Sequence, residues 1–401
     1  MIKMDSYILR QISLLIILVI SLSSSSCSDK NTKSNDSQIV IEKTWIGFKE
    51  IFIKSDGRVK RVENSDTVSE GQAYAMLRAV WMNDKVYFDK CYRWTEENLS
   101  RVRDKGDNLL GWRWKDGAVV DWMPAADADV DYALGLIFAD IRWAGLSPVG
   151  VEDYGLKAKA VLFDILEKET FVTLGGRIYL APWILDKEEK LEVFPLNPSY
   201  YSPAHFRVFY DYTGDDRWTE LADTSYYVLN SLLTEFDGQK GIGLVPDWCG
   251  VDNLDGFHVL HGKNSGFGYE AVRVPFRIGL DFMWFGRVKA KEFLSGFNCF
   301  LENQMKLNGG IYCEYDYAGR AVKVYESPAF YSCYYFAMKV SGSDYVNRVF
   351  EKIQEYVLKS DSGLYYQSKD EYYSNCLSWL ADGYKSGRIK NLFRQGIKND
   401  N

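Results

Sequence analysis

Apolar residues recur at three- and four-residue spacing through most of the chain after residue 40, which is the pattern of amphipathic helices. About eleven such stretches occur, separated by loops rich in Gly, Pro, Asn and Asp. They read EGQAYAMLRAVWM, YFDKCYRWTEENLSRV, DVDYALGLIFADIRWAG, DYGLKAKAVLFDILEK, PAHFRVFYDYTG, WTELADTSYYVLNSLLTEF, EAVRVPFRIGLDFMWFG, AKEFLSGFNCFLENQMKL, PAFYSCYYFAMKVSG, SDYVNRVFEKIQEYVL and NCLSWLADGYKSG. Strand-like pieces such as RIYLAPW and LYYQS are few. The pattern predicts a mainly α domain over residues 40–395, either an α/α toroid of alternating inner and outer helices or a helical solenoid.

The N-terminal segment has the pattern of an export signal. Lys3 and Arg10 precede the apolar run QISLLIILVISL, which is too short to span a bilayer. We therefore interpret residues 1–26 as a signal peptide. Cys27 follows small residues, as in a bacterial lipoprotein box, and would be the lipidated residue; cleavage without lipidation is the alternative. Residues 27–39 then predict a flexible tether, so we expect an exported protein anchored to a membrane only through its lipid, in the periplasm or at the cell surface.

The composition narrows the classes of partner. The 401 residues carry a net charge of −7 with acids and bases interspersed, which argues against nucleic acid. Aromatic residues make up 15% of the chain, enough for a large core and for a surface on which flat ligands stack. The cysteines after Cys27 form no CxxC pair, so a zinc site is not expected. Buried free thiols are favoured, although disulfides are open to an exported protein, and we expect a monomer.

Glu70 begins a helical stretch, between a serine and a glycine in SEGQAYAMLRAVW. Ser69 is a suitable N-cap, and Gln72, three residues later, completes the pattern of a capping box. On this fragment alone, Glu70 is interpreted as an acid that stabilises the first helical turn through the helix dipole. A catalytic role is the competing interpretation, and it requires partners elsewhere in the chain.

Three aspartates, Asp127, Asp129 and Asp131, alternate at the start of another helical stretch, AADADVDYALGLIFADIRW. Helix capping and first-turn acids account for some of these carboxylates but not for all three. The pattern also suggests calcium, but the glycine and the closing glutamate of an EF-hand loop are missing. A metal is therefore the lesser interpretation, and no metal or cofactor is predicted.

Glu270 and Arg273 lie on one side of a third predicted helix, directly after Tyr269. Polar groups within an apolar helix are usually paired, so a structural ion pair explains them as well as a site does. Two more loops carry tyrosine pairs before helices, namely Tyr200 and Tyr201 in LNPSYYSPAHF and Tyr372 and Tyr373 in EYYSNCLSWL. If the helices alternate around a barrel, these junctions line one end of it, where we expect a cleft.

Several of these segments match one family in order. SEGQAYAM is similar to a general-acid segment SEGxxYxM, and AADAD to a signature A-S/T-D-A/G-D, with Ala126 in place of Ser or Thr. NPSYYSPA, GLVPDW, ESPAF and YYSNCLSWL follow in the same order. Together they resemble glycoside hydrolase family 8 over nearly the whole chain after the tether. The resemblance implies an (α/α)6 barrel, which agrees with the helix count.

The resemblance also implies an inverting endo-hydrolase of β-1,4-linked glycans, xylan or glucan. Glu70 would be the general acid, Asp127 would hold the sugar beside the cleaved bond, and Glu270 would be the base. The family usually has Asp at this last position, so the arm here is longer by one methylene, roughly 1.5 Å. An inverting mechanism predicts that the two catalytic carboxyl groups face each other roughly 6.5–9.5 Å apart.

The remaining site residues come from the same resemblance. Tyr269 and Arg273 match residues that orient the base and the water, and Trp112 matches a tryptophan of the cleft. The tyrosines at 200, 201, 372 and 373 match site tyrosines, with the sugar-facing member of each pair left open. The alternative function is a glycan-binding lipoprotein with the same barrel, whose turnover is weak or lost through the Asp-to-Glu change. A lyase would need His or Lys beside a site tyrosine, and the chain has only 3 His. The identity of the sugar stays open.

Overall fold

The computed structural model describes residues 37–144, 146–148, 150–186, 188 and 190–399. The predicted signal peptide, Cys27 and most of the predicted tether lie outside these residues. The predicted end of the tether at residue 39 is wrong, because a helix already includes residues 37–52. Ser37 is buried there, and Gln38 donates a hydrogen bond to Glu42 one turn later. The predicted domain end at residue 395 likewise falls inside helix α15 (Leu392–Asn399).

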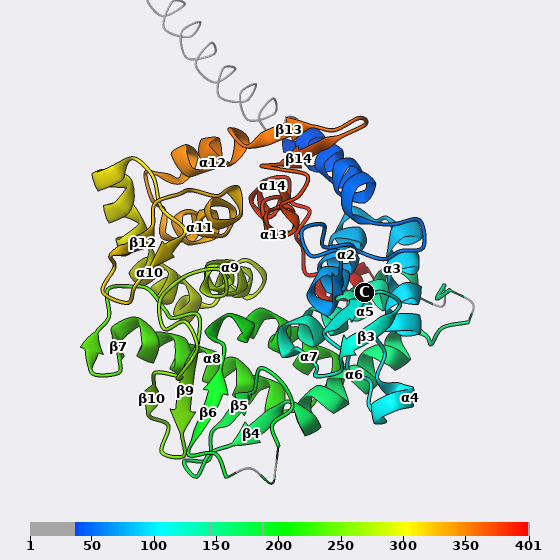
Figure 1. Ribbon diagram of the computed structural model, residues 1–401, viewed down its shortest axis with the longest axis horizontal. Coiled ribbons are helices and arrows are strands. Elements are labelled where there is room, and N and C mark those ends of the chain that lie inside the picture. The colour runs from blue at the N-terminus through cyan, green and yellow to red at the C-terminus, as the bar shows by residue number, and fades with distance from the viewer. Residues whose placement is uncertain (1–36, 145, 149, 187, 189, 400–401) are drawn as a thin grey trace, which may run out of the picture.

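Six helices form a closed inner ring. They are α2 (Ser69–Met82), α5 (Ala126–Trp143), α7 (Pro203–Thr213), α9 (Val274–Phe285), α11 (Pro328–Ser341) and α13 (Tyr372–Leu377). Each contacts the next in this order, and α13 contacts α2 to close the ring, as the view along the barrel shows (Figure 1). The closure excludes an open solenoid and confirms the toroid.

The outer layer alternates with the inner one along the chain. It consists of the helix that includes residues 37–52, α3 (Lys85–Asn98), α6 (Tyr154–Lys168), α8 (Arg217–Thr234), α10 (Val288–Asn308) and α12 (Val346–Gln354). The layers differ in burial as a two-layer barrel requires. All residues from Ala126 to Ala139 of α5 are buried, whereas α12 buries only Val349 and Ile353. The predicted (α/α)6 barrel is therefore confirmed.

Most predicted helices match observed ones, but the long helix that includes residues 37–52 was not predicted, and the other differences are at short elements. The stretch NCLSWLADGYKSG is divided between α13 and α14 (Leu380–Lys385), and α4 (Val102–Lys105) was not predicted. Glycine ends α7, α10 and α11 in the left-handed region, with φ of 73° at Gly214, 66° at Gly309 and 78° at Gly342. A residue without Cβ takes this conformation at little cost, so the chain can reverse sharply into the next helix.

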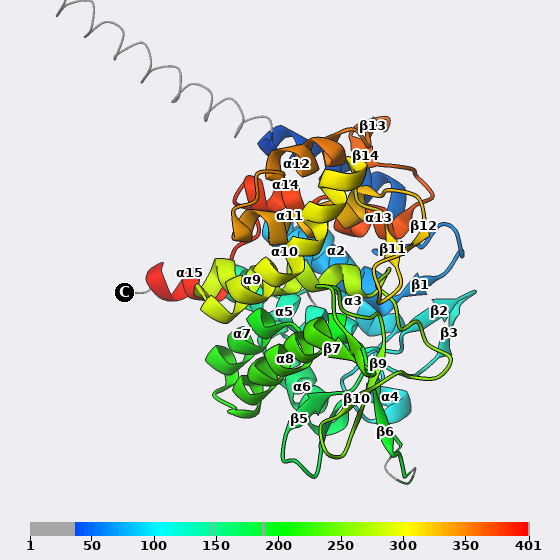
Figure 2. The same cartoon turned by 90° about the vertical axis from the view of Figure 1, so that its left-hand side faces the viewer.

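Short antiparallel strands occupy the loops, and they are more numerous in the described residues than the sequence predicts. One sheet has the order β1 (Thr67–Val68), β2 (Arg113–Lys115), β3 (Ala118–Asp121), and another β10 (Phe257–His258), β9 (Cys249–Asp252), β6 (Val193–Leu196). Two-stranded pairs are β4 (Thr170–Val172) with β5 (Ile178–Leu180), β7 (Glu235–Phe236) with β8 (Gln239–Lys240), β11 (Glu314–Tyr315) with β12 (Ala321–Lys323), and β13 (Val357–Lys359) with β14 (Leu364–Tyr366). Only β5 and β14 were predicted. Both three-stranded sheets and the β11–β12 pair lie at one end of the barrel (Figure 2).

The core is continuous from the inner ring into the gap between the layers. The six cysteines of the described residues are free thiols, and all but Cys299 are buried, as favoured from the sequence. Across the described helices, none is both long and apolar enough to cross a bilayer.

Candidate active site

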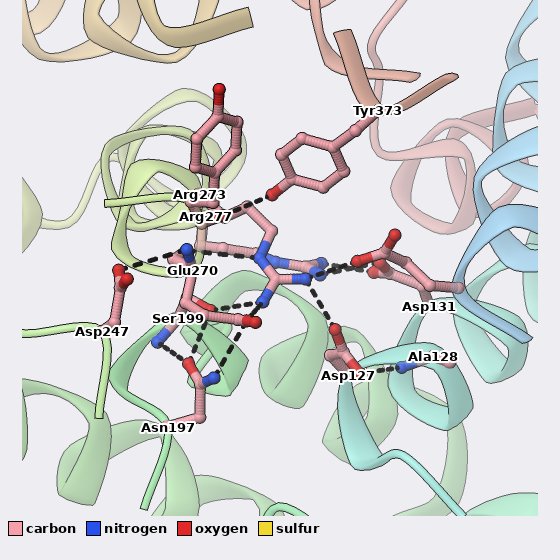
Figure 3. A network of polar contacts seen from close by, with 12 residues as sticks. Asp127, Ala128, Asp131, Asn197, Ser199, Asp247, Glu270, Arg273, Arg277 and Tyr373 are labelled. Atoms are coloured by element: carbon pink, nitrogen blue, oxygen red, sulfur yellow. Dashed lines mark hydrogen bonds and ion pairs between the residues drawn. The ribbon is translucent and has the colours of Figure 1, made fainter. Parts of the chain in front are cut away.

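A single arginine gathers three carboxylates at the end of the barrel that carries the strands. Nη1 of Arg273 donates to Glu70 Oε2 and to Asp127 Oδ2, both at 2.7 Å. Nη2 donates to Glu270 and, at 2.9 Å, to the hydroxyl of Ser199 (Figure 3). The arginine side chain is only 2% exposed, whereas those of Glu70 and Glu270 keep 20% and 34%. The cation is therefore behind the acids, and the acids are open to the cleft.

Glu70 reaches this position because its helix begins at the cleft. Ser69 is the first helical residue rather than the N-cap, and its amide donates to the carbonyl of Trp112 at 2.9 Å. The predicted capping box is wrong. Gln72 instead accepts from the amide of Val59 at 2.5 Å and donates to Thr95 at 3.0 Å, because a backbone amide from an earlier loop competes for it. Glu70 is thus an acid of the first helical turn whose side chain does not cap the helix and instead contacts Arg273 in the cleft.

Gly71 is required for the ring packed beside Glu70. A Cβ at position 71 would lie 2.2 Å from the hydroxyl oxygen of Tyr372, which is far inside contact distance. The SEG motif therefore combines an acid for the cleft with the only residue type that admits Tyr372 so close to the helix.

The environment of Glu70 favours the protonated form of its carboxyl. Burial raises the pKa of this carboxyl, Arg273 lowers it, and the nearby Asp127 and Glu270 raise it again, to about 8. The helix terminus alone would favour the ionised form. Desolvation and like charge outweigh that effect and favour the protonated form, which is the form that a general acid requires.

The three aspartates of the second motif point in three directions. Asp127 contacts Arg273 and accepts from the amide of Ala128 at 2.9 Å, at the cleft. Burial raises its pKa, and Arg273 opposes this. Asp129 turns away from the cleft and accepts from the amide of Leu110 at 3.0 Å. The N-cap is Ala125, so none of the three caps the helix through its side chain.

Asp131 forms a second bridge between the same two helices, one turn deeper. It holds Arg277 through both oxygens, with Oδ2 at 2.7 Å, and its Oδ1 lies 3.1 Å from His205 Nε2. Asp131 and Arg277 follow Asp127 and Arg273 by four residues each, so the two aspartate–arginine bridges stack along α5 and α9. The deeper pair is 1% exposed on both sides. It fixes the helices that carry the cleft pair.

Glu270 is held from two sides. Besides Arg273, its Oε2 accepts from the side-chain amide of Asn197 at 3.0 Å. Its backbone amide donates to Asp247 at 3.1 Å (Figure 3). Glu270 is therefore not buried against Arg273 alone, and it lines the same cleft as Glu70. Glu70 and Glu270 both contact the guanidinium of Arg273, and the separation of roughly 6.5–9.5 Å between their carboxyl groups stays a prediction.

Aromatic rings line the cleft around these acids. The cleft holds about 310 Å³, within the range of small-ligand pockets. Its rings are those of Trp112, Tyr200, Tyr269, Tyr372 and Tyr373, all of them predicted. Of the pair left open in the NPSYYSPA loop, Tyr200 lines the cleft, whereas Tyr201 is 1% exposed and donates to the carbonyl of Leu180.

Several polar groups of the site were missed from the sequence. They are Asn197, Ser199 and Asp247, which contact Glu270 or Arg273, and Arg61 and Glu63 on the cleft lining. Asn197 and Ser199 lie inside NPSYYSPA, and Asp247 lies inside GLVPDW. The resemblance therefore pointed to the right segments but not to these single residues. No group of three or more His, Cys, Asp or Glu side chains suited to a metal ion is found in the described part of the chain.

A barrel cleft that holds a carboxyl with a raised pKa, a second carboxylate close by and a wall of rings is typical of enzymes that cleave glycosidic bonds. The comparison with known families identifies which one. The chain belongs to the glycosyl hydrolases family 8, whose model matches residues 14–387. It is therefore a glycoside hydrolase.

Relatives and solved structures agree with this assignment. The chain is 29% identical over 396 residues to endoglucanase 2 of Ruminiclostridium josui, covering 93% of this chain and 77% of that protein. It is 30% identical over 379 residues to endoglucanase A of Acetivibrio thermocellus, covering 89% and 71%. The structure of a β-1,3-1,4-glucanase from Paenibacillus sp. X4 shares the fold, with a TM-score of 0.74 at 23% identity over 89% of this chain and 93% of that one.

Proposed function

We propose that the protein is an inverting endo-hydrolase of a β-1,4-linked glycan, with Glu70 as general acid and Glu270 as base. The observation that carries the proposal is the cluster at Arg273. It joins one carboxyl whose pKa is raised by burial and like charge to a second that is more exposed and fixed by Arg273 and Asn197.

The proposed reaction is a single displacement at the anomeric carbon. Water attacks this carbon while the bond to the leaving oxygen breaks. Glu270 takes a proton from the attacking water, and Glu70 gives its proton to the leaving oxygen, so the two carboxyl groups exchange protonation states in each turnover. Solvent then resets both.

Asp127 and Arg273 support this chemistry from the floor of the cleft. Asp127 is 5% exposed at its side chain and lines the cleft, where it would face the sugar beside the cleaved bond. Its charge raises the pKa of Glu70, and a hydrogen bond from a sugar hydroxyl would help to distort the ring. Arg273 balances the charge of the acids and keeps Glu270 from turning away from the water.

The glutamate at position 270 fits this scheme despite its longer arm. Asn197 and Arg273 both contact the same oxygen, Oε2, which leaves Oε1 for the water. These contacts draw the carboxylate toward the cleft floor and take up the extra methylene. This argument favours turnover over the alternative of a glycan-binding protein.

The substrate proposed first is β-1,4-glucan, with xylan second. The rings of Trp112 and Tyr200 offer flat faces for pyranose stacking. Relatives that share about 30% of their residues with this chain are named endoglucanases, which supports glucan. Glucose and xylose differ at C6, so a panel of substrates decides between them.

The test is release of reducing sugar from carboxymethyl-cellulose and from xylan. We expect release by the wild type and a loss of at least 1,000-fold in Glu70→Gln, because the amide cannot donate the proton. Glu167→Gln on outer helix α6 serves as the matched control and should remain active. Binding to these glycans without release would reject the enzyme and favour the binding protein.

We also propose that the chain is exported and anchored through lipid on Cys27, on the pattern of its N-terminal segment. Labelled palmitate should be incorporated into the wild type and not into Cys27→Ser. Equal labelling of both proteins, or of neither, would reject the anchor.

A further inference from the structure

Asp247 lies behind the turn that carries Glu270, and its contacts converge on that turn. Its Oδ1 accepts three backbone amides, from Gly268 at 2.9 Å, Glu270 at 3.1 Å and Ala271 at 2.8 Å. Its Oδ2 accepts from the side chain of Asn264 at 2.7 Å. One carboxylate thus accepts hydrogen bonds from most of the backbone amides of the turn formed by residues 268–271.

The carboxylate of Asp247 lies behind the residues that line the cleft and is not itself part of the lining. Asp247 is 5% exposed and does not line the pocket that contains Glu70 and Glu270. Its own amide donates to the carbonyl of Gly266 at 2.7 Å, so its backbone is bonded to the segment that leads into the turn. It therefore cannot act on water or sugar directly, and its effect must pass through the turn.

The turn is shaped to receive this carboxylate. A Cβ at Gly268 would lie 2.8 Å from Oδ2 of Asp247, so a larger residue would push the acid away. Beyond the turn, Ala271–Arg273 form a 3-10 turn that leads into α9. The turn thus connects Asp247 to Glu270 and, through the 3-10 turn that follows, to Arg273, which directly precedes α9.

Glu270 is consequently fixed at both ends. Asp247 holds its backbone amide, while Arg273 and Asn197 hold its carboxylate. A long, partly exposed side chain loses precision when its backbone moves, and small displacements of a catalytic group are costly.

We propose that Asp247 is a positioning residue for the base: by binding the amides of the turn it sets where the Glu270 carboxylate meets the attacking water. The inference rests on the proposed function. In this proposal Asp247 affects turnover but does not contact the substrate.

The kinetic test compares Asp247→Ala with Asp247→Asn. In Asp247→Ala we expect kcat to fall about 10- to 100-fold with KM within about threefold. Asp247→Asn keeps an oxygen that accepts the amides and should recover most of kcat. Asp382→Asn, at an equally buried acid far from the turn, should leave kcat and KM close to wild type. A rise in KM with unchanged kcat, or no recovery by Asn, would overturn the proposal.

A second experiment, in a variant that lacks the base, distinguishes a role in positioning Glu270 from a loss of structure across the whole site. In Glu270→Ala, azide can attack the anomeric carbon without a base, giving a glycosyl azide while the leaving oxygen takes the proton of Glu70. Adding Asp247→Ala to this variant should change the azide-supported rate less than twofold, because there is no base left to position. A further 10-fold loss would show that Asp247 acts on the whole site and would overturn the proposal.

Hydrogen–deuterium exchange tests the turn without any substrate. In Asp247→Ala, the amides of 268, 270 and 271 should exchange at least 10-fold faster, with those of inner helix α5 unchanged. Unchanged exchange in the turn overturns the inference even if the enzyme is active. A wild type that releases no sugar rejects the proposed function and with it the catalytic half of this inference, while exchange still decides whether Asp247 holds the turn.

Discussion

Replacing Asp127 with Asn should lower the pKa of Glu70 and shift the alkaline limb of activity to lower pH. Glu70 must be protonated to donate, so activity is present below its pKa and lost as the pH rises through it. The limb of the wild type is therefore expected near pH 8. Asn keeps the size of Asp127 and removes a negative charge that favours the protonated form of Glu70.

The structure bounds the size of this shift. The contacting oxygens of Glu70 and Asp127 each lie 2.7 Å from the same nitrogen of Arg273, so they are at most about 5.4 Å apart. Two unit charges at that distance interact by about 3 kcal/mol at an effective dielectric of 20 and by about 0.8 kcal/mol in water. One pKa unit corresponds to about 1.4 kcal/mol. Arg273 would also be left with one carboxylate fewer, which acts in the same direction, so we expect a downward shift of about one to two pH units.

The assay is kcat/KM against pH on a soluble cello-oligosaccharide, which reports the groups of the free enzyme. Asp129→Asn is the matched control, since this residue lies on the same helix, turns away from the cleft and bonds Leu110. Its alkaline limb should stay near that of the wild type. A limb that stays in place or moves upward in Asp127→Asn would refute the reasoning that like charge keeps Glu70 protonated.

Three further substitutions test other parts of the account. Asp131→Ala should lower the free energy of unfolding by about 3–5 kcal/mol in urea denaturation, because Arg277 stays buried without its carboxylate; the exposed Asp223→Ala should change it little, and equal losses would contradict this. Gly71→Ala should cut kcat/KM at least 10-fold by displacing Tyr372, and Tyr372→Phe in the same chain should restore part of it. Gly135→Ala, where a Cβ meets no atom closer than 3.8 Å, should be tolerated, and a similar loss there would remove the steric explanation. Tyr200→Ala should raise KM about 3- to 10-fold, whereas Tyr201→Ala should leave KM near that of the wild type and lower the melting temperature more than Tyr200→Ala does; the reverse result would exchange their roles.

The local spacing of apolar residues predicted most of the helices of the fold. The inner helices are apolar on nearly all sides and the outer ones on one side, so spacing located most of them, although the outer helix that includes residues 37–52 was missed. Ring closure is different, since it depends on contact between α13 and α2, which are far apart in the chain. The strands were mostly missed because they have two to four residues each, too few for an alternating pattern.

The sequence predicted which segments form the site, but it predicted fewer of the contacts between their residues. The three alternating aspartates exceeded what capping needs, and that excess was a true signal. The directions of Asp127 and Asp131 depend on arginines that are 146 positions away, whereas Asp129 accepts from Leu110, 19 positions away. Gln72 shows the opposite error, since a local rule assigned it to the helix end while a distant amide binds it.

The anomeric configuration of the first product tests the central claim most directly. Proton NMR during early hydrolysis of cellohexaose by the wild-type protein separates newly formed α and β reducing ends before they interconvert. An inverting reaction through Glu70 and Glu270 predicts that the α form appears first and relaxes to the equilibrium mixture. Release of the β form first would contradict the assigned acid–base pair.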